Sequence, residues 1–218
     1  MESETKICVC IGKVPFDMIS GILKEVEMAE IRLDLAELSE DEIRSLFPGH
    51  DNLIATCREG HYNNLQRARI LEIAIEYGAA WIDIEADSEP SWRSSMIKLV
   101  KASEAKLILS RHFFTHTPSY TAMKKMADEM FSMGADVVKI AAQINHSSDA
   151  AALLGLYSDP RNIVAIGMGT QGVITRIASS FLGAPFTFAS LNDDEFTADG
   201  QIEYNEMASL VKKISSYG

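Results

Sequence analysis

The feature that most constrains this chain is a regular alternation between short β-rich runs and longer amphipathic stretches, repeated eight times. The β-rich runs cover residues 6–12, 28–35, 52–57, 81–87, 106–113, 137–143, 162–169 and 186–191. Strict alternation of strands and helices implies parallel strands joined by right-handed crossovers. The sequence therefore predicts an α/β fold with a parallel sheet.

Eight such units in 218 residues average about 27 residues each, which suits a minimal strand–loop–helix–loop repeat. Eight units can close into a (β/α)8 barrel, the TIM barrel, although typical barrels have about 250 residues. An open doubly wound sheet also alternates strands and helices, but no dinucleotide-binding glycine fingerprint follows the first strand here. No linker or low-complexity tract is visible, so we expect a single barrel domain covering residues 1–218.

The clearest helical pattern covers residues 63–77, where apolar residues recur at helical spacing. Its expected apolar face consists of Leu65, Ala68, Ile70, Leu71, Ile73, Ala74 and Ile75. Turn chemistry predicts further helix starts near Ser39, Pro90 and Ser119. Gly78 follows the helical stretch, where a residue in the left-handed conformation is expected.

Two of the expected strands carry charges where a parallel barrel strand should be almost continuously apolar. Glu30, Arg32 and Asp34 alternate with aliphatic residues, and the two-residue period of a strand puts all three on one face. Asp83 and Glu85 repeat the pattern opposite two isoleucines. The aliphatic faces must meet the surrounding helices, so the charged faces should point into the barrel. One such strand would fit a structural ion pair, but two favour a polar active-site mouth.

A lysine and a histidine lie near the ends of neighbouring strands. Lys139 interrupts an apolar run, and His112 stands near the end of the strand before it. Adjacent strands are only about 4.8 Å apart, so both side chains can reach one small molecule. A desolvated lysine near other cations is a nucleophile for carbonyl groups, and an imidazole moves protons near neutrality. A lone lysine could instead extend from the strand end toward water, but the pair indicates Schiff-base chemistry.

Three further segments lie where strands give way to loops. Arg58 and Glu59 follow the third strand, and residues 167–172 form a glycine-rich turn before a helix that carries Arg176. Such glycines either cradle a phosphate at the helix N-terminus or only shape the loop, in which case Arg176 can bind a carboxylate. The loop at residues 192–202, after the last strand, is expected to close over a substrate.

Composition disfavours several kinds of partner. Acidic residues outnumber basic ones by 31 to 20, for a net charge of −11, which argues against nucleic acid and anionic membrane surfaces. No apolar run approaches the roughly 18 residues of a membrane span. The polar N-terminal residues 1–6 and three cysteines, read as free thiols, lead us to expect a cytoplasmic protein. No histidine or cysteine pair has metal-ligand spacing, so no metal is expected.

Short motifs on successive strands resemble those of the type I 3-dehydroquinate dehydratases, the Schiff-base-forming dehydratases of the shikimate pathway and aromatic amino-acid biosynthesis. The resemblance runs from about Lys6 to the last expected helix. The matching motifs are Glu-Ile-Arg-Leu-Asp at 30–34, Arg-Glu-Gly at 58–60, Ile-Asp-Ile-Glu at 82–85, Ser-Arg-His at 110–112, Val-Lys-Ile-Ala at 138–141, Gly-Val-Ile-Thr-Arg at 172–176 and Thr-Ala-Asp-Gly-Gln at 197–201. The resemblance implies a TIM-barrel lyase that converts 3-dehydroquinate to 3-dehydroshikimate without a cofactor, and it implies a homodimer.

The resemblance also assigns expected roles to individual residues. It makes Lys139 the Schiff-base lysine that attacks the C3 ketone, His112 the general acid and base, and Glu59 the residue that orients His112. It implies substrate contacts or site support from Glu30, Arg32, Arg58, Asp83, Arg176, Thr197 and Gln201. Within that set, Arg176 would hold the substrate carboxylate.

The sequence departs from the family pattern at two places. Asp199 stands where the family's loop commonly has proline, and Phe113 follows His112 where an acid or amide is common. A class I aldolase acting on a phosphorylated sugar is a rival interpretation that the glycine-rich turn would suit. A non-enzymatic binding protein is a second rival, but burying a lysine and a histidine costs stability without serving simple binding.

Overall fold

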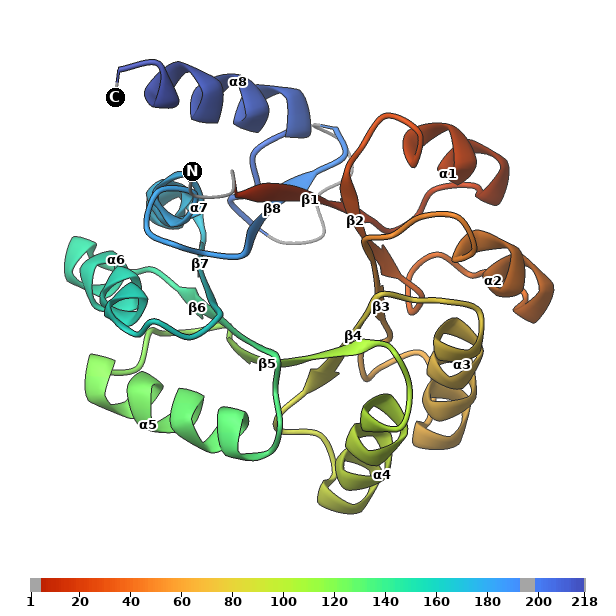
Figure 1. Ribbon diagram of the computed structural model, residues 1–218. Coiled ribbons are helices and arrows are strands. Elements are labelled where there is room, and N and C mark those ends of the chain that lie inside the picture. The colour runs from red at the N-terminus through yellow and green to blue at the C-terminus, as the bar shows by residue number, and fades with distance from the viewer. Residues whose placement is uncertain (1–4, 193–198, 218) are drawn as a thin grey trace.

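The computed structural model describes residues 5–192 and 199–217, and it confirms the expected barrel. In these residues eight strands alternate with eight α-helices, and the helices surround the strands (Figure 1). The strands are β1 (Lys6–Ile11), β2 (Met28–Arg32), β3 (Leu53–Thr56), β4 (Trp81–Glu85), β5 (Lys106–Phe113), β6 (Val137–Gln143), β7 (Ile163–Met168) and β8 (Phe186–Ser190). The α-helices are α1 (Phe16–Ile22), α2 (Glu40–Leu46), α3 (Asn64–Glu76), α4 (Pro90–Lys101), α5 (Tyr120–Ser132), α6 (Ser147–Leu154), α7 (Val173–Ser179) and α8 (Tyr204–Ser215), with 3-10 turns η1 (Gly155–Ser158) and η2 (Thr170–Gly172). Across the described part of the chain, none of the helices combines the length and apolar character that crossing a membrane requires.

The strands pair in parallel, and neighbours in the sequence are also neighbours in the sheet. The order is β7-β6-β5-β4-β3-β2-β1-β8, so that β1 pairs with both β2 and β8. The pairing of the first strand with the last curls the sheet into a ring (Figure 1), which an open doubly wound sheet does not form. No ladder joins β7 to β8 among the described residues, so the barrel is nearly closed.

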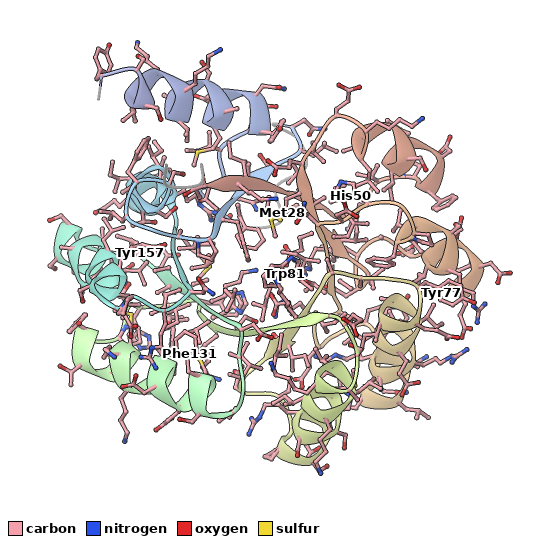
Figure 2. The ribbon with its side chains drawn as sticks, viewed as in Figure 1. Met28, His50, Tyr77, Trp81, Phe131 and Tyr157 are labelled. Atoms are coloured by element: carbon pink, nitrogen blue, oxygen red, sulfur yellow. The ribbon has the colours of Figure 1, made fainter. Side chains whose placement is uncertain are left out.

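The two faces of the strands contribute to separate apolar cores. Outward-facing residues such as Ile31, Ile82 and Ile140 are fully buried against the helices. Inward-facing residues near the strand starts fill the barrel with Cys8, Met28, Ile54, Ile108, Val137 and Phe186, against which Trp81 packs. Figure 2 shows Met28 and Trp81 inside the ring of strands. Apolar side chains therefore fill the interior of the barrel at the amino-terminal ends of the strands.

The inward-facing positions become polar farther along several strands. On β2, β4, β5 and β6 these positions hold Glu30, Asp83, Ser110 and Lys139, all of them buried. This placement confirms that the charged faces of β2 and β4 point into the barrel. The polar layer lies toward the carboxyl ends of the strands, which is the end where TIM-barrel active sites lie.

Local turn chemistry sets the helix ends as the sequence predicts. Ser39 caps α2 through a capping box with Glu42, and Pro90 occupies the first turn of α4 behind a Glu89 side-chain cap. After α3, Gly78 has a φ of 99°, which glycine adopts without the steric cost that a Cβ brings.

Helix α3 buries six of the seven residues of the expected apolar face at least in part, and it departs from that face only in its first turn. Leu65 at the start of α3 is 81% exposed, and Arg67 is only 1% exposed. The buried residues of α3 are Arg67, Leu71, Ile73 and Ala74, and the first two are four residues apart on one face. The expected apolar face was therefore wrong in the first turn, because Arg67 takes the buried position and donates to Cys57 O, Glu59 and Glu85, which a leucine could not do.

Candidate active site

A cavity of about 530 Å³ opens at the carboxyl ends of the strands, a size typical of small-molecule sites. Eight of the side chains expected from the sequence line it: Glu30, Arg32, Arg58, Glu59, His112, Lys139, Arg176 and Gln201. Asp83 lies behind this wall, in contact with Lys139. Thr197 lies outside the described residues.

Lys139 lies at the centre of the polar layer, with its side chain only 7% exposed. Its Nζ is 3.3 Å from Glu30 Oε1 and 3.2 Å from Asp83 Oδ2. On a third side Nζ lies 3.9 Å from the centre of the Phe188 ring, a cation–π contact. Two carboxylates and an aromatic face thus hold the amino group at the floor of the cavity.

Asp83 is fixed by a network of donors from β5, β6 and the segment that follows β3. Arg58 donates from Nη1 to Asp83 Oδ1 at 3.1 Å and from Nη2 to Oδ2 at 2.7 Å, a bidentate pair. Ser110 Oγ accepts from Arg58 and donates to Asp83 Oδ1 at 2.6 Å. Burial opposes ionisation of Asp83, but the positive charges of Arg58 and Lys139 prevail and hold its pKa below the ordinary value. Asp83 is therefore a fixed anion beside Lys139.

Glu30 is the second anion beside the lysine. Its Oε1 accepts from Thr56 Oγ1 at 2.8 Å, and its Oε2 accepts from the thiol of Cys10 at 3.4 Å. Burial acts to raise the pKa of Glu30, but the positive charges of Lys139, Arg32 and Arg58 together outweigh it, so the net shift is downward. These contacts orient both carboxylate oxygens.

His112 lies on the cavity wall above the lysine. In the β5–β6 register Ser110 pairs with Lys139 and His112 pairs with Ala141, so the imidazole lies nearer the mouth. Burial, together with the positive charges of Arg58 and Lys139, lowers the pKa of His112 to about 3. Its ring stacks on that of Phe114, with centroids 5.8 Å apart. At neutral pH the imidazole is uncharged, which is the form that accepts a proton.

A prediction follows for the substrate-free protein. We expect the ring signals of His112 in an NMR titration to stay constant between pH 5 and 8, because its pKa of about 3 lies far below the reference value near 6.5. The signals that disappear in His112→Ala identify the ring. In the unfolded state the imidazole binds a proton below about pH 6.5, whereas in the folded state it stays neutral down to about pH 3. His112 therefore lowers the free energy of unfolding as the pH drops below about 6.5. A His112 signal that titrates near pH 6.5 would contradict this account.

Glu59 lies at the cavity rim, with its side chain 57% exposed. Its Oε1 accepts from Arg67 Nη1 at 3.2 Å, and its backbone N–H donates to Glu85 Oε2 at 3.3 Å. Within the described part of the chain, no hydrogen bond joins Glu59 to His112. Burial raises the pKa of Glu85, although nearby Arg58 and Arg67 act in the opposite direction.

The two remaining arginines differ in their partners. Arg32 forms a bidentate pair with Asp34, with its Nε 3.0 Å from Oδ1 and Nη2 2.6 Å from Oδ2. Arg176 is 1% exposed, and in the described part of the chain its Nη1 reaches only the backbone oxygen of Phe188, at 3.5 Å. Its Nε has no hydrogen-bond partner among the described residues. Burial lowers the pKa of Arg176 to about 10, which still leaves it charged at neutral pH. Among the described residues no carboxylate pairs with this guanidinium, which lines the cavity. A buried guanidinium of this kind is suited to bind an anionic ligand.

The glycine-rich turn serves packing in this structure. A Cβ on Gly172 would lie 2.4 Å from the backbone carbon of Gly167, so the two glycines let the chain approach itself. Thr175 Oγ1 accepts from the N–H of Gly167 and donates to the oxygen of Gly172, both at 2.7 Å. The Gly167 N–H is thus already bound within the protein, which favours the loop-shaping interpretation over a phosphate cradle.

The segment after β8 rests on this turn. Gly169 N donates to Asp199 O at 3.3 Å, and a Cβ on Gly200 would lie 2.5 Å from Gly169 O. Gly200 also has a φ of 76°, so only glycine suits this position. Gln201 is buried at the cavity wall, and its Nε2 donates to Cys10 Sγ at 3.2 Å.

Several site residues were missed by sequence reasoning. Ser110 and Phe188 both contact the central charge cluster, and Cys10 joins Glu30 to Gln201. Ser110 could have been found, because it lies two residues before His112 and must share its face. Neither an isolated phenylalanine nor a cysteine carries such a signal. Across the described residues, no group of three or more His, Cys, Asp or Glu side chains is arranged to hold a metal ion.

Comparisons of the sequence with a family model and with known proteins all point to the same family. A family model described as Type I 3-dehydroquinase matches residues 7–217. The 3-dehydroquinate dehydratase of Dehalococcoides mccartyi is 33% identical over 220 residues, which cover 96% of this chain and 96% of that protein. The protein of the same name from Thermococcus gammatolerans is 34% identical over 191 residues, covering 85% of this chain and 86% of that protein.

Solved structures agree with these sequence matches. The 3-dehydroquinate dehydratase from Aquifex aeolicus is similar with a TM-score of 0.79 and 26% identity, over 96% of this chain and 98% of that chain. The type I 3-dehydroquinate dehydratase from Clostridium difficile has a TM-score of 0.85 at 24% identity, over 100% of this chain and 94% of that chain, a likeness of fold. The similarity therefore extends along nearly the whole barrel.

Proposed function

Because this chain belongs to the type I 3-dehydroquinase family, we propose that it is a hydro-lyase that converts 3-dehydroquinate to 3-dehydroshikimate through a Schiff base at Lys139. The observation that carries this proposal is the combination of Lys139 and Arg176 in one cavity. The first is the only kind of side chain here that forms an imine with a ketone, and the second offers a buried charge to a carboxylate.

The first step is attack of the Lys139 amine on the C3 ketone. The C3–N bond forms, the ketone oxygen leaves as water, and the resulting iminium carries the positive charge that the ammonium carried before. Glu30 and Asp83, each within 3.3 Å of Nζ, stabilise that charge through the step. His112 assists by moving protons to and from the departing oxygen.

The second step removes water across C1 and C2. The iminium withdraws electrons, so the C2 proton becomes acidic and passes to the neutral imidazole of His112. The electron pair left at C2 forms the C1–C2 double bond as the C1 hydroxyl leaves with a proton from His112. Water then hydrolyses the imine, which releases the product and restores the Lys139 amine.

Substrate positioning falls to the charged groups around the lysine. Arg176 binds the carboxylate, and Arg32 with its partner Asp34 addresses ring hydroxyls at the mouth. Arg58 has two roles. It contacts the substrate, and through its hydrogen bonds to Asp83 and Ser110 it fixes the Asp83 carboxylate. Gln201 lines the cavity from the segment after β8 and contacts the substrate there. Thr197, which lies outside the described residues, stays an expected substrate contact.

Arg176→Met is expected to raise the KM by about 10- to 150-fold, the loss of a charge-assisted pair worth roughly 1.5–3 kcal/mol. Methionine fills similar space without a charge, so the substrate-free protein should melt at the same or a higher temperature, because an unpaired buried guanidinium is removed. Steady-state kinetics and thermal melts test both parts. An unchanged KM would mean that the carboxylate binds elsewhere.

The activity itself has a direct readout. The product contains a double bond conjugated with its ketone, so mixing the protein with 3-dehydroquinate should make ultraviolet absorbance of an enone grow with time. Absence of that growth at high enzyme concentration would refute the proposed reaction.

Membership of this family also supports an expected cellular location and an expected oligomeric state. We propose that the enzyme works in the cytoplasm as a homodimer. Sedimentation equilibrium distinguishes a dimer from a monomer over the working range of concentration.

A further inference from the structure

A fully buried arginine lies behind the rim of the active site, outside the residues discussed for catalysis. Arg67, on the inward side of α3, is 1% exposed. Its guanidinium lies 4.2 Å from the centre of the Trp92 ring, and its Nε donates to Cys57 O at 3.0 Å. Its Nη1 also donates to Asn64 Oδ1 at 3.1 Å. The guanidinium is therefore packed against an aromatic ring on one face and hydrogen-bonded along its edge.

The remaining donors of Arg67 reach two carboxylates that line the cavity. Nη1 donates to Glu59 Oε1 at 3.2 Å, and Nη2 donates to Glu85 Oε2 at 3.2 Å. The same Glu85 oxygen accepts the backbone N–H of Glu59 at 3.3 Å. Arg67 thus connects the end of β3 to the end of β4 and fixes the chain at the position where Arg58 and Glu59 enter the cavity.

A purely structural role would not require this residue type. A buried ion pair is replaced by apolar side chains of similar volume at little cost or with a gain in stability. In contrast, a planar guanidinium is the group that can direct two carboxylates and a carbonyl at fixed angles. Glu59 has a largely exposed side chain, and without a partner it would occupy many rotamers.

We infer that Arg67 is a positioning residue of this active site, which acts by holding the Glu59 carboxylate at the rim of the cavity. The inference rests on the proposed function and on the role that the family resemblance implies for Glu59, which is to orient the general base His112. In the described residues Glu59 is hydrogen-bonded to Arg67 and Glu85 and not to His112, so the carboxylate would act on the imidazole once substrate is bound. Displacement of such a supporting group by about 1 Å costs on the order of 100-fold in rate.

A double-mutant cycle tests the inference. Arg67→Lys keeps the charge and loses the planar fork, and we expect it to lower kcat by about 10- to 100-fold with KM changed less than about threefold. In a Glu59→Gln background the same change should cost less than about threefold, because the group through which Arg67 acts is already gone. Arg69→Lys is the matched control, since Arg69 lies on the same helix and pairs with Glu40 on the surface at 3.0 Å.

The inference would be overturned if Arg67→Lys lowered kcat equally in both backgrounds, or if its loss were no larger than that of Arg69→Lys. In either case an active wild-type enzyme would leave the proposed function standing. A wild type without dehydratase activity would refute the proposed function instead. If Arg67→Lys does not fold, Glu59→Asp decides, because the change is at the exposed rim and withdraws the carboxylate from Arg67 by one methylene. A kcat of Glu59→Asp equal to that of the wild type would then overturn the inference, and a loss of tenfold or more would support it.

Discussion

Replacing His112 with alanine is expected to slow dehydration by about 10²- to 10⁴-fold while substrate still binds and the imine still forms slowly. The reason lies in the separation of two steps, since Lys139 supplies the amine and His112 only moves protons. The pKa of about 3 keeps the imidazole neutral, so the wild-type enzyme loses no base to protonation at neutral pH. Steady-state kinetics give the rate, and calorimetric titration gives the binding.

A surface histidine provides the control for this result. His146 is exposed at the start of α6 and should tolerate alanine without loss of kcat. A His112→Ala enzyme that keeps its dehydration rate would show that another group takes the C2 proton.

Replacing Lys139 is expected to have the largest effect of all. Lys139→Ala should lose turnover by roughly 10⁴-fold or more, because both the covalent electron sink and the alignment it gives are removed. Leaving Glu30 and Asp83 without their ammonium partner should also cost about 3–5 kcal/mol of stability, as for other broken buried pairs. Lys139→Arg separates the two effects, since it restores a positive charge but no amine that can form an imine.

The measurement for this variant set is kcat together with a thermal melt. We expect Lys139→Arg to be more stable than Lys139→Ala and equally inactive. Activity in Lys139→Arg that approaches the wild type would show that the charge, and not the covalent bond, is what the reaction requires.

The barrel could be predicted from the sequence because the two-residue repeat of its strands and the 3.6-residue repeat of its helices are local patterns. The boundaries of β5 and β6 agree with the expected runs, and the inward direction of Glu30 and Asp83 followed from alternation alone. Aliphatic neighbours on the opposite face left only one orientation in which the helices could cover them.

The partners within the site could not be predicted in the same way. Alternation places Asp83 and Ser110 on inner faces, but the bidentate pair between Arg58 and Asp83 depends on a three-dimensional path across strands. Likewise, an isolated histidine suggests chemistry near neutrality, whereas burial near two cations lowers the pKa of His112 to about 3. Environment, not residue type, sets that value.

The first turn of α3 shows where periodicity misleads. Leu65 completes an apolar pattern in the sequence, yet it faces solvent, and Arg67 takes the buried position. An arginine is rarely fully buried unless it is paired, and the pairs here come from residues at the ends of β3 and β4. The sequence of the helix alone does not indicate those partners.

The most direct test of the central claim is to trap the imine. When substrate and borohydride are added together, reduction of the C=N bond should attach the ligand permanently and inactivate the protein. Peptide mass mapping should then place the added mass on Lys139, and Lys139→Ala should gain none. An adduct that maps to another lysine, or a wild-type enzyme that remains unmodified and active after treatment, would contradict the Schiff-base mechanism.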